Sequence, residues 1–391
     1  MAVGPDEDAE VRRRKFLSTT AAGAIALLVD GEPVRLSTEG LVLWRADLDE
    51  LRRVLRTESR GAIAVPVSRQ AEGLVRMLHG TPEGAPLYRP LAELTAETAM
   101  LAGWATDDRG DAATGNNWCR VAAHASRQAR NPNLLAMSLE DWAWGADSVG
   151  RLPDALGLLG RMPVDAITPG TRAAVEVGRA MLLARAGRAN GALAALDQME
   201  RNAGRDTAPG RLPVDADRVQ QVRGYTLVEM GFAAPAYQLL ASLPRRPSQW
   251  INHALTQTNL AMAAAQMGEV DQACKHAAEA HAVFAEAQSV KGVQRVIRFR
   301  AQKLEPYADT SAVRELDDYL RTATGGGQRY VTTRSRRGKD SLHRADCPYM
   351  LRGAPSVKRR TWTGGRGRTP AEVAADGGVR ATFDVCTVCM R

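Results

Sequence analysis

The chain has 391 residues, and its composition of 45% apolar, 25% charged and 5% aromatic residues excludes a disordered protein and favours packed helices over an aromatic-rich sandwich or barrel. The net charge of +8 is uneven, because residues 328–391 hold 14 Lys and Arg against five Asp and Glu, whereas residues 1–327 hold 38 against 39. A basic tail on a nearly neutral body predicts an anionic partner such as nucleic acid or an acidic protein, with a purely solubilising tail as the alternative.

Five cysteines are too few, and odd in number, for a disulfide scaffold in a chain of this length. This count favours a reducing compartment. Cys119 and Cys274 fall in helical stretches and are expected to be small core residues.

Residues 1–30 form an N-terminal segment in which Arg13 and Arg14 precede a run of small and apolar residues. This arrangement is typical of a twin-arginine export signal. However, Arg12 stands where Ser or Thr is usual, and no A-x-A-like cleavage site follows. The run is also too short to span a bilayer, which takes about 20 apolar residues. We therefore expect a cytoplasmic protein with no integral membrane association, and export by the twin-arginine route is the alternative.

A repeated pattern marks residues 31–322. Glycine is followed five residues later by alanine at Gly150/Ala155, Gly187/Ala192, Gly231/Ala236 and Gly268/Ala273. A small residue lies seven positions before each glycine, and an apolar residue lies nine positions after it: Ala143, Ala180, Gly224 and Ala261, then Leu159, Leu196, Leu240 and Ala277. A weaker copy has Gly103, Gly110 and Gly115 at the same offsets. Each central glycine is predicted to end a helix in the left-handed conformation, and the small residues let the next helix approach closely.

Each unit is therefore an antiparallel helix pair that buries its apolar face only by stacking on its neighbours. The pattern is that of tetratricopeptide repeats. We predict an all-α fold, a tetratricopeptide-like helical solenoid, with a generic helical bundle as the alternative. Helices are expected over 138–150, over 213–231 with Asp215 or Asp217 as N-cap, and over 310–320, and "PGRLPVDAD" (209–217) is expected to be a Pro-rich break.

The runs "LAGWATDDRGDAATG", "GRLPDAL" and "VQRVIRFRAQKLEPYADTSAVRELDDYL" resemble the helical half of actinobacterial helix-turn-helix/tetratricopeptide transcriptional regulators. The resemblance covers about residues 10 to 322. It implies that Arg13 to Leu17 is a linker inherited from that family, where an RRxFL segment joins the DNA-binding part to the repeats. Only "MAVGPDEDAEV" precedes Arg12, so we expect the family's helix-turn-helix to be absent here.

The tail carries four potential metal ligands. A Gly-rich linker is predicted over 323–329 and a basic module over 330–391, where His343 and Cys347 form an H-x3-C pair and Cys386 and Cys389 form a C-x-x-C pair. One imidazole and three thiolates match a structural Cys3His zinc site with no open position for catalysis. A thioredoxin-type redox couple lacks its βαβ context, and a Cys386–Cys389 disulfide is the other alternative.

Between these pairs we predict strands over "RYVTT" and "VRATFDV", and a helix that begins with Thr369 as its N-cap. This α+β order resembles the small zinc-binding module of DNA-repair methyl-acceptor proteins and of some nuclease tails, although "DVC" stands where "PC" is usual. A role as a nucleic-acid repair or nuclease-associated factor is therefore a further alternative.

Basic residues and one tryptophan surround the expected zinc site. Contacts to phosphates and stacking on a base are expected of Arg334, Arg336, Arg337, Lys339, Lys358, Arg359, Arg360, Trp362, Arg366 and Arg368. The alternative is a solvated basic face with Trp362 in a small core.

The sequence contains no phosphate loop, nucleophile elbow or paired-carboxylate motif. We therefore expect a non-enzymatic regulator that holds a peptide or protein partner in the groove of its repeats. An exported extracytoplasmic binding or scaffold protein is the competing class.

Overall fold

The computed structural model describes residues 37–57, 60–211, 213–244 and 250–323, and strands at 329–334, 340–344, 359–363 and 384–385. By their contacts the residues group into two compact units, Met1–Glu305 and Pro306–Arg391. The described residues up to 323 form helices and short 3-10 turns, which confirms the predicted all-α class for this part of the chain. The twin-arginine-like motif of residues 12–17 lies outside the described ranges.

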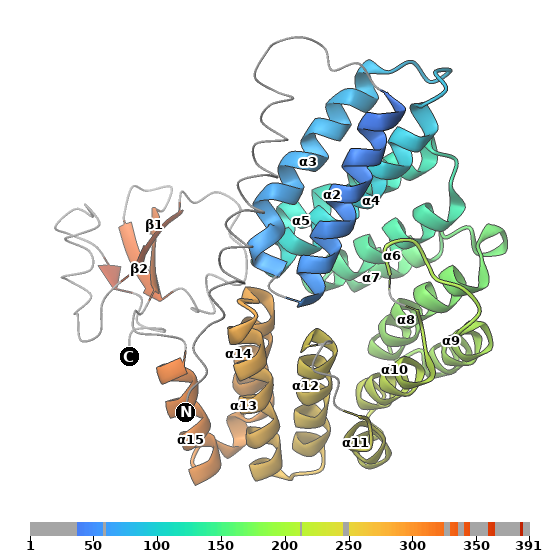
Figure 1. Cartoon of the computed structure of the whole chain (residues 1–391). Helices are drawn as coiled ribbons and strands as arrows, with labels where there is room; N and C mark the ends of the chain where they lie inside the picture. The colour runs from blue at the N-terminus through green and yellow to red at the C-terminus, as the bar shows by residue number, and fades with distance from the viewer. Residues whose placement is uncertain are drawn as a thin grey trace, which may run out of the picture. The chain divides into compact units, whose positions relative to one another are not determined.

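Figure 1 shows the helices of the first unit following one another from blue α2 to orange α14. Their bounds are α2 Thr38–Thr57, α3 Arg60–Gly80, α4 Tyr88–Asp108, α5 Ala112–Gln128, α6 Pro132–Ser148, α7 Leu152–Leu159, α8 Pro169–Arg185, α9 Ala189–Asn202, α10 Ala216–Glu229, α11 Ala233–Ala241, α12 Trp250–Gln266, α13 Val270–Glu286 and α14 Val290–Lys303. The helices predicted over 138–150 and 213–231 are present as α6 and as α10 with the turn that follows it. Asp215 caps α10, because its carboxylate accepts a hydrogen bond from the Arg218 amide at 2.8 Å.

The predicted turn glycines adopt the left-handed conformation. The φ angles of Gly110, Gly150, Gly187, Gly231 and Gly268 lie between +72° and +89°. At Gly150, for example, the amides of Gly150 and Arg151 donate to the carbonyls of Asp147 and Ala146 at 2.9 and 3.0 Å, so the last turn of α6 closes in a Schellman motif. The prediction that glycine ends the first helix of each pair is confirmed at all five positions.

Two other turns have the same geometry without glycine. Arg130, between α5 and α6, has φ +52°, and Gln288, between α13 and α14, has φ +53°. Each is followed by a capping side chain: Asn131 accepts from the Leu134 amide, and Ser289 accepts from the Gly292 amide. The cap offsets part of the cost of a left-handed non-glycine residue.

The small residues lie where helices meet. Ala143, Ala180 and Ala261 are fully buried, and a Cβ added to Gly224 would lie 2.5 Å from the Leu240 side chain. In the weaker copy, a Cβ on Gly103 would lie 3.3 Å from the Gly115 carbonyl oxygen. These contacts confirm the expected close approach of paired helices.

The even-numbered helices α4, α6, α8, α10, α12 and α14, here called the inner helices, pack on one another in series, and α14 packs back on α4. At this closing contact the Ser289 hydroxyl donates to Asp108 at 2.7 Å, and Lys291 forms an ion pair with Asp107. The inner helices of the first unit therefore form a closed circuit, and the sequence did not predict this closure.

In the second unit, α15 (Ser311–Ala323) confirms the predicted helix near 310–320. The strands are β1 Arg329–Arg334, β2 Asp340–Arg344, β3 Arg359–Thr363 and β4 Asp384–Val385, in the sheet order β3-β1-β2-β4. β1 confirms the strand predicted over "RYVTT", and the described end of "VRATFDV" is β4. His343 lies in strand β2, and neither β2 nor β3 was predicted.

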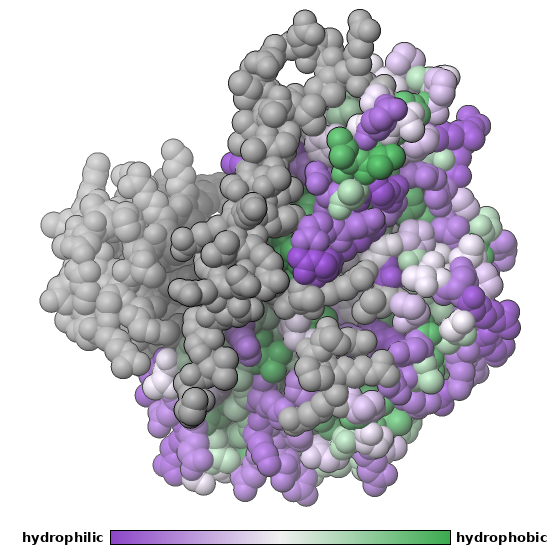
Figure 2. Space-filling model, in the orientation of Figure 1, coloured by the Kyte–Doolittle hydropathy of each residue, from purple (hydrophilic) through white to green (hydrophobic). Residues whose placement is uncertain are grey.

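The visible face of the helices is mostly hydrophilic, with separate apolar groups between the polar ones (Figure 2). This distribution is what amphipathic helices produce when each buries one face. Among the described helices, none combines the length and the apolar character that crossing a membrane would require.

Candidate functional site

Charged side chains are buried on the inner helices. Glu97 of α4, Glu140 and Asp141 of α6 and Glu176 of α8 are each less than a tenth exposed. A buried carboxylate is costly unless it is paired, so each of these groups needs a partner close by.

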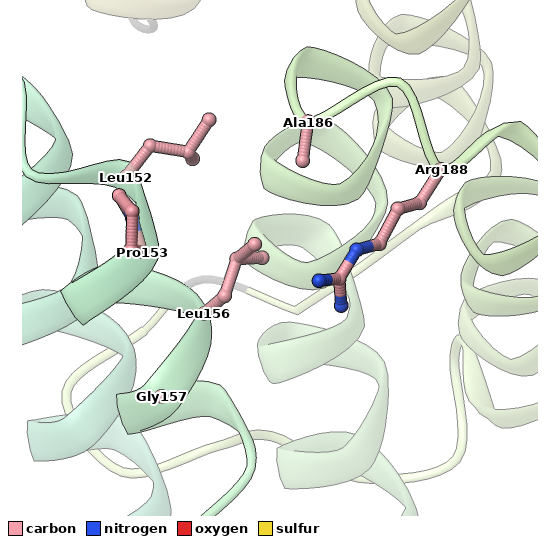
Figure 3. A pocket seen from close by; sticks show the side chains of 6 residues that line it. All are labelled: Leu152, Pro153, Leu156, Gly157, Ala186 and Arg188. Carbon is pink, nitrogen blue, oxygen red and sulfur yellow. The ribbon is translucent and has the colours of Figure 1, made fainter.

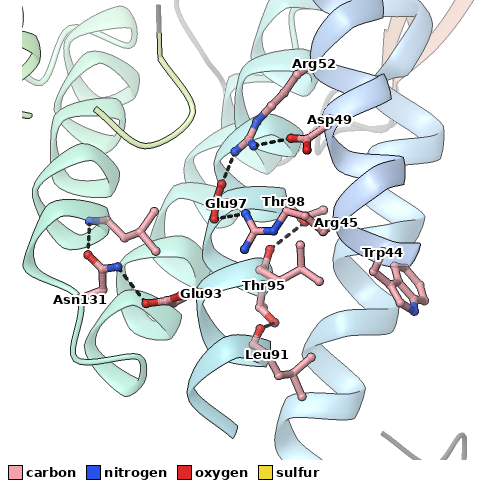
Figure 4. Close-up of polar contacts among 12 residues, drawn as sticks. Trp44, Arg45, Asp49, Arg52, Leu91, Glu93, Thr95, Glu97, Thr98 and Asn131 are labelled. Carbon is pink, nitrogen blue, oxygen red and sulfur yellow. Dashed lines mark hydrogen bonds and ion pairs between the residues drawn. The ribbon is translucent and has the colours of Figure 1, made fainter. Parts of the chain in front are cut away.

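Glu97 is paired by two arginines from α2. Arg45 and Arg52 each form an ion pair with one of its carboxylate oxygens, and Arg52 also contacts Asp49 at 3.1 Å (Figure 4). This arrangement binds α2 to α4, and it places the Arg52 guanidinium at the edge of the inner helices.

A long connection between α9 and α10 crosses the inner helices. We call residues 203–215 the strap; in Figure 1 it is the yellow-green loop that rises from α9 toward α6 and returns to α10. The Gly204 amide donates to the Val214 carbonyl at 3.1 Å, which ties the base of the strap. At its tip the Arg211 amide donates to the Ala208 carbonyl at 3.1 Å, with Gly210 between them at φ +72°.

The strap inserts one arginine among the inner helices. The Arg211 guanidinium contacts Glu140 at 2.7 Å, forms an ion pair with Asp141, and lies over the Trp104 ring at 4.0 Å from its centroid. The side chains of Arg211, Glu140 and Asp141 are 18%, 6% and 3% exposed. One guanidinium is therefore held by two desolvated carboxylates and one aromatic face, the set of partners that suits this planar cation best.

Neighbouring residues hold the carboxylates in place. The Trp144 indole N–H donates to Glu140 at 2.6 Å. On α8, Gly178 leaves room for Glu140, because a Cβ there would lie 2.8 Å from its carboxylate oxygen. Elsewhere along the strap, Gly210 lies against Arg52 and Met100, and Asp206 accepts from the Gly170 amide at the start of α8.

Burial governs the ionisation of this cluster. Desolvation, together with the neighbouring Asp141 carboxylate, raises the pKa of Glu140 to about 7, and Arg211 opposes the shift. Desolvation also raises the pKa of Asp141. For Arg211, burial is the largest influence and acts downward, but attraction to the two carboxylates outweighs it and raises the pKa overall.

Further cations lie on α8, α10 and α14. Arg185 contacts Glu229 at 2.6 Å and also pairs with Asp147, so it links three inner helices. The pKa of Arg295 is lowered by burial and then by repulsion from Arg185 and Arg298. Burial likewise lowers the pKa of Arg218. These cations all lie on inner helices.

A polar pocket of about 200 Å³ adjoins α10, α11 and α12 and is lined in part by Asp215, Arg218, Gln257 and His276. His276 contacts the Tyr237 hydroxyl at 3.0 Å and Gln257 at 2.6 Å, so both ring nitrogens have side-chain partners. The nearby Tyr225 hydroxyl lies 3.0 Å from the Thr256 hydroxyl. These side chains form a hydrogen-bond network that joins α10, α11, α12 and α13.

A second hollow of about 480 Å³ lies beside α7 and the turn after α8. Figure 3 shows Leu152, Pro153 and Leu156 on one side and Ala186 and Arg188 on the other. Its mainly apolar lining offers no convergent polar groups that would fix a ligand's orientation.

Of the four expected zinc ligands, only His343 lies among the described residues; Cys347, Cys386 and Cys389 lie outside them. Strands β2 and β4 pair in parallel, with Leu342 opposite Val385. The residues that directly precede His343 and Cys386 in the sequence are thus neighbours in the sheet. Within the described ranges, no group of three or more His, Cys, Asp and Glu side chains is placed to hold a metal ion.

Four of the ten residues expected to meet nucleic acid are described. Strands β1 and β3 pair with Thr333 opposite Arg359, so Arg334, Arg359 and Arg360 lie at one end of two neighbouring strands, and Trp362 pairs with Tyr330. Arg336, Arg337, Lys339, Lys358, Arg366 and Arg368 lie outside the described ranges. Cys119 and Cys274 are buried in α5 and α13, as predicted.

Sequence reasoning did not identify the Arg211 cluster. It treated "PGRLPVDAD" only as a break, and it treated "SLEDWAWG" only as a helix. The feature of the sequence that could have revealed the cluster is the acidic pair Glu140–Asp141 inside an apolar helical run. Two acidic residues in a buried helix need a cation as partner. No protein-family model matches the chain, and a search of curated proteins found no match either.

Proposed function

We propose that this protein is a non-enzymatic regulatory adaptor that holds a peptide segment of a partner protein against its inner helices. The proposed scaffold is a tetratricopeptide-like solenoid whose ends meet. The observation that carries the proposal is the set of desolvated charged side chains on these helices, among them Glu140, Asp141 and Arg295. Charges kept away from water at a cost in stability are typical of recognition surfaces.

The chemistry of this face also favours binding over catalysis. Arg211, Glu140 and Asp141 satisfy one another, and the histidine of the polar pocket is engaged on both nitrogens. These partners can select a charged or polar peptide by complementary hydrogen bonds and ion pairs.

Selection from a random peptide library on the immobilised full chain tests this function. Enriched peptides carrying a photoreactive group should cross-link to the inner helices, because these helices bear the buried carboxylates Glu97, Glu140, Asp141 and Glu176. No enrichment over a blank surface, or cross-links confined to α5, α7, α9, α11 and α13, would remove the proposal.

For the tail we propose a structural zinc site formed by His343, Cys347, Cys386 and Cys389, beside a basic surface that contacts nucleic acid. The pairing of β2 with β4 supports the zinc site, and the gathering of Arg334, Arg359 and Arg360 at one strand end supports the basic surface. Bound zinc would neutralise the thiolates and hold a small domain together. A link to transcriptional regulation rests on the resemblance to the helix-turn-helix/tetratricopeptide regulators.

We propose a cytoplasmic location for the protein. Replacing Arg13 and Arg14 by Lys should leave its location unchanged in fractionated cells, because a twin-arginine pathway requires that pair and the proposed linker does not. Loss of an exported pool in the double variant would instead establish the exported class.

A further inference from the structure

The Arg211 site is built by rigid elements and filled by a loop. Its walls are Trp104 on α4 and Glu140 and Asp141 on α6, two inner helices that pack on each other. Trp144 and Gly178 fix the position of Glu140 from α6 and α8. The walls therefore do not depend on the strap for their placement.

The strap is held at its base, at Asp206 and at Arg211, and two of its residues enter the core. Of its described residues, Ala208 and Val214 are buried and Arg211 is largely buried, while Arg205, Asp206 and Thr207 are exposed. Gly204, at the base of the strap, and Gly210, beside Arg211 at its tip, both have φ +72°. The contacts of Arg211 with α4 and α6 are made by its side chain, so this side chain can leave its site without unfolding a helix.

Two carboxylates face one guanidinium, and Arg218 is the next cation near Glu140. An incoming arginine side chain can therefore replace Arg211 without leaving the carboxylates unpaired, and it can use the same aromatic face.

We propose that Trp104, Glu140 and Asp141 form a guanidinium-binding site for an arginine side chain of a peptide ligand, and that Arg211 of the strap occupies this site until such a ligand displaces it. The proposal rests on the adaptor function proposed above and specifies its ligand chemistry. In the free protein Arg211 competes with the ligand for the site. The apparent affinity for a ligand is therefore lower than it would be at an empty site.

Calorimetric titration of the full chain with N-acetyl-arginine amide tests the site. Arg211→Ala should bind this compound at least tenfold more tightly than the wild type, because the competitor is gone. Arg205→Ala, an exposed arginine of the same strap, should behave like the wild type. Adding Glu140→Gln to Arg211→Ala should reverse the gain, and N-acetyl-lysine amide should bind more weakly, since it lacks the planar fork.

If folded Arg211→Ala, checked by circular dichroism, binds N-acetyl-arginine amide no more tightly than the wild type, the proposal is wrong. If that variant does not fold, hydrogen exchange of the wild-type protein tests the proposal instead. The amides of Gly204 and Arg211 should exchange faster in millimolar N-acetyl-arginine amide than in the lysine compound, and equal rates would overturn the proposal.

The two proposals can fail separately. Tight binding of N-acetyl-arginine amide by Arg211→Ala without any enriched library peptide would keep the site and remove the adaptor. Enriched peptides that cross-link to the inner helices while N-acetyl-arginine amide fails to bind would keep the adaptor and remove the site.

Discussion

Single glycines decide how closely helices pack in this protein. Gly224 on α10 lies against Leu240 on α11, whereas Gly157 on α7 has open space where a Cβ would be. Both lie in helices, where alanine has the higher intrinsic propensity. Replacing each glycine by alanine therefore distinguishes the effect of helix packing, at Gly224, from the effect of helix propensity, at Gly157.

Gly224→Ala should lower the free energy of unfolding by about 1–3 kcal/mol, because the new Cβ overlaps the Leu240 side chain. Gly157→Ala should raise it by about 0.5–1 kcal/mol through helix propensity. Urea denaturation measures both. Equal effects of the two substitutions would contradict this account of the repeat.

Glu140 should make stability depend on pH. Its pKa is raised from 4.5 to about 7 in the folded protein, so between these values the folded state binds more protons than the unfolded state. Stability should therefore fall as pH rises from about 4.5 to about 7, by on the order of 3 kcal/mol for this group. Glu140→Gln should flatten the profile over that window, and Glu286→Gln, on an exposed position of α13, should not.

Thermal melts across this pH range provide the measurement. An unchanged slope in Glu140→Gln would show that the carboxylate is ionised throughout and that Arg211 outweighs burial.

At the scale of elements, turn chemistry could be predicted and long-range contacts could not. The glycine turns follow from local backbone sterics, so Gly110 and Gly268 were identifiable from the sequence. The turns at Arg130 and Gln288 use residues with no such preference. The strap is held by partners about 70 residues away along the chain, and no local pattern encodes that pairing.

The contact between α14 and α4 that closes the circuit of inner helices includes the Ser289 side chain. Ser289 both caps α14 through the Gly292 amide and donates to Asp108 at the end of α4, 181 residues away. Its loss should therefore affect two distant helix ends at once.

Ser289→Ala should destabilise the protein by about 1–2 kcal/mol and raise hydrogen exchange at the end of α4 as well as at the start of α14. Thr168→Ala removes the N-cap of α8, which is not at the closing contact, and should leave α4 unchanged. Exchange at α4 that is unaffected by Ser289→Ala would mean that the circuit does not depend on this contact.

At the scale of the whole molecule, the tail is predicted to carry a metal. The wild-type chain should contain one zinc ion by elemental analysis, Cys386→Ser should lose it, and Cys274→Ala, on α13 of the helical unit, should retain it. A metal-free wild-type protein purified without chelator would contradict the zinc site. The spacing of the ligands was readable from the sequence, and the pairing of β2 with β4 was not.

The central proposal is that the inner helices hold a peptide and that Arg211 of the strap occupies the site of the peptide's arginine until the peptide binds. A crystal structure of the full chain bound to an enriched, arginine-containing peptide tests this most directly. We expect the peptide to lie along the even-numbered helices, with its guanidinium between Trp104 and Glu140 and with Arg211 withdrawn. A peptide bound to the odd-numbered helices, with Arg211 still on Glu140 and Asp141, would contradict it.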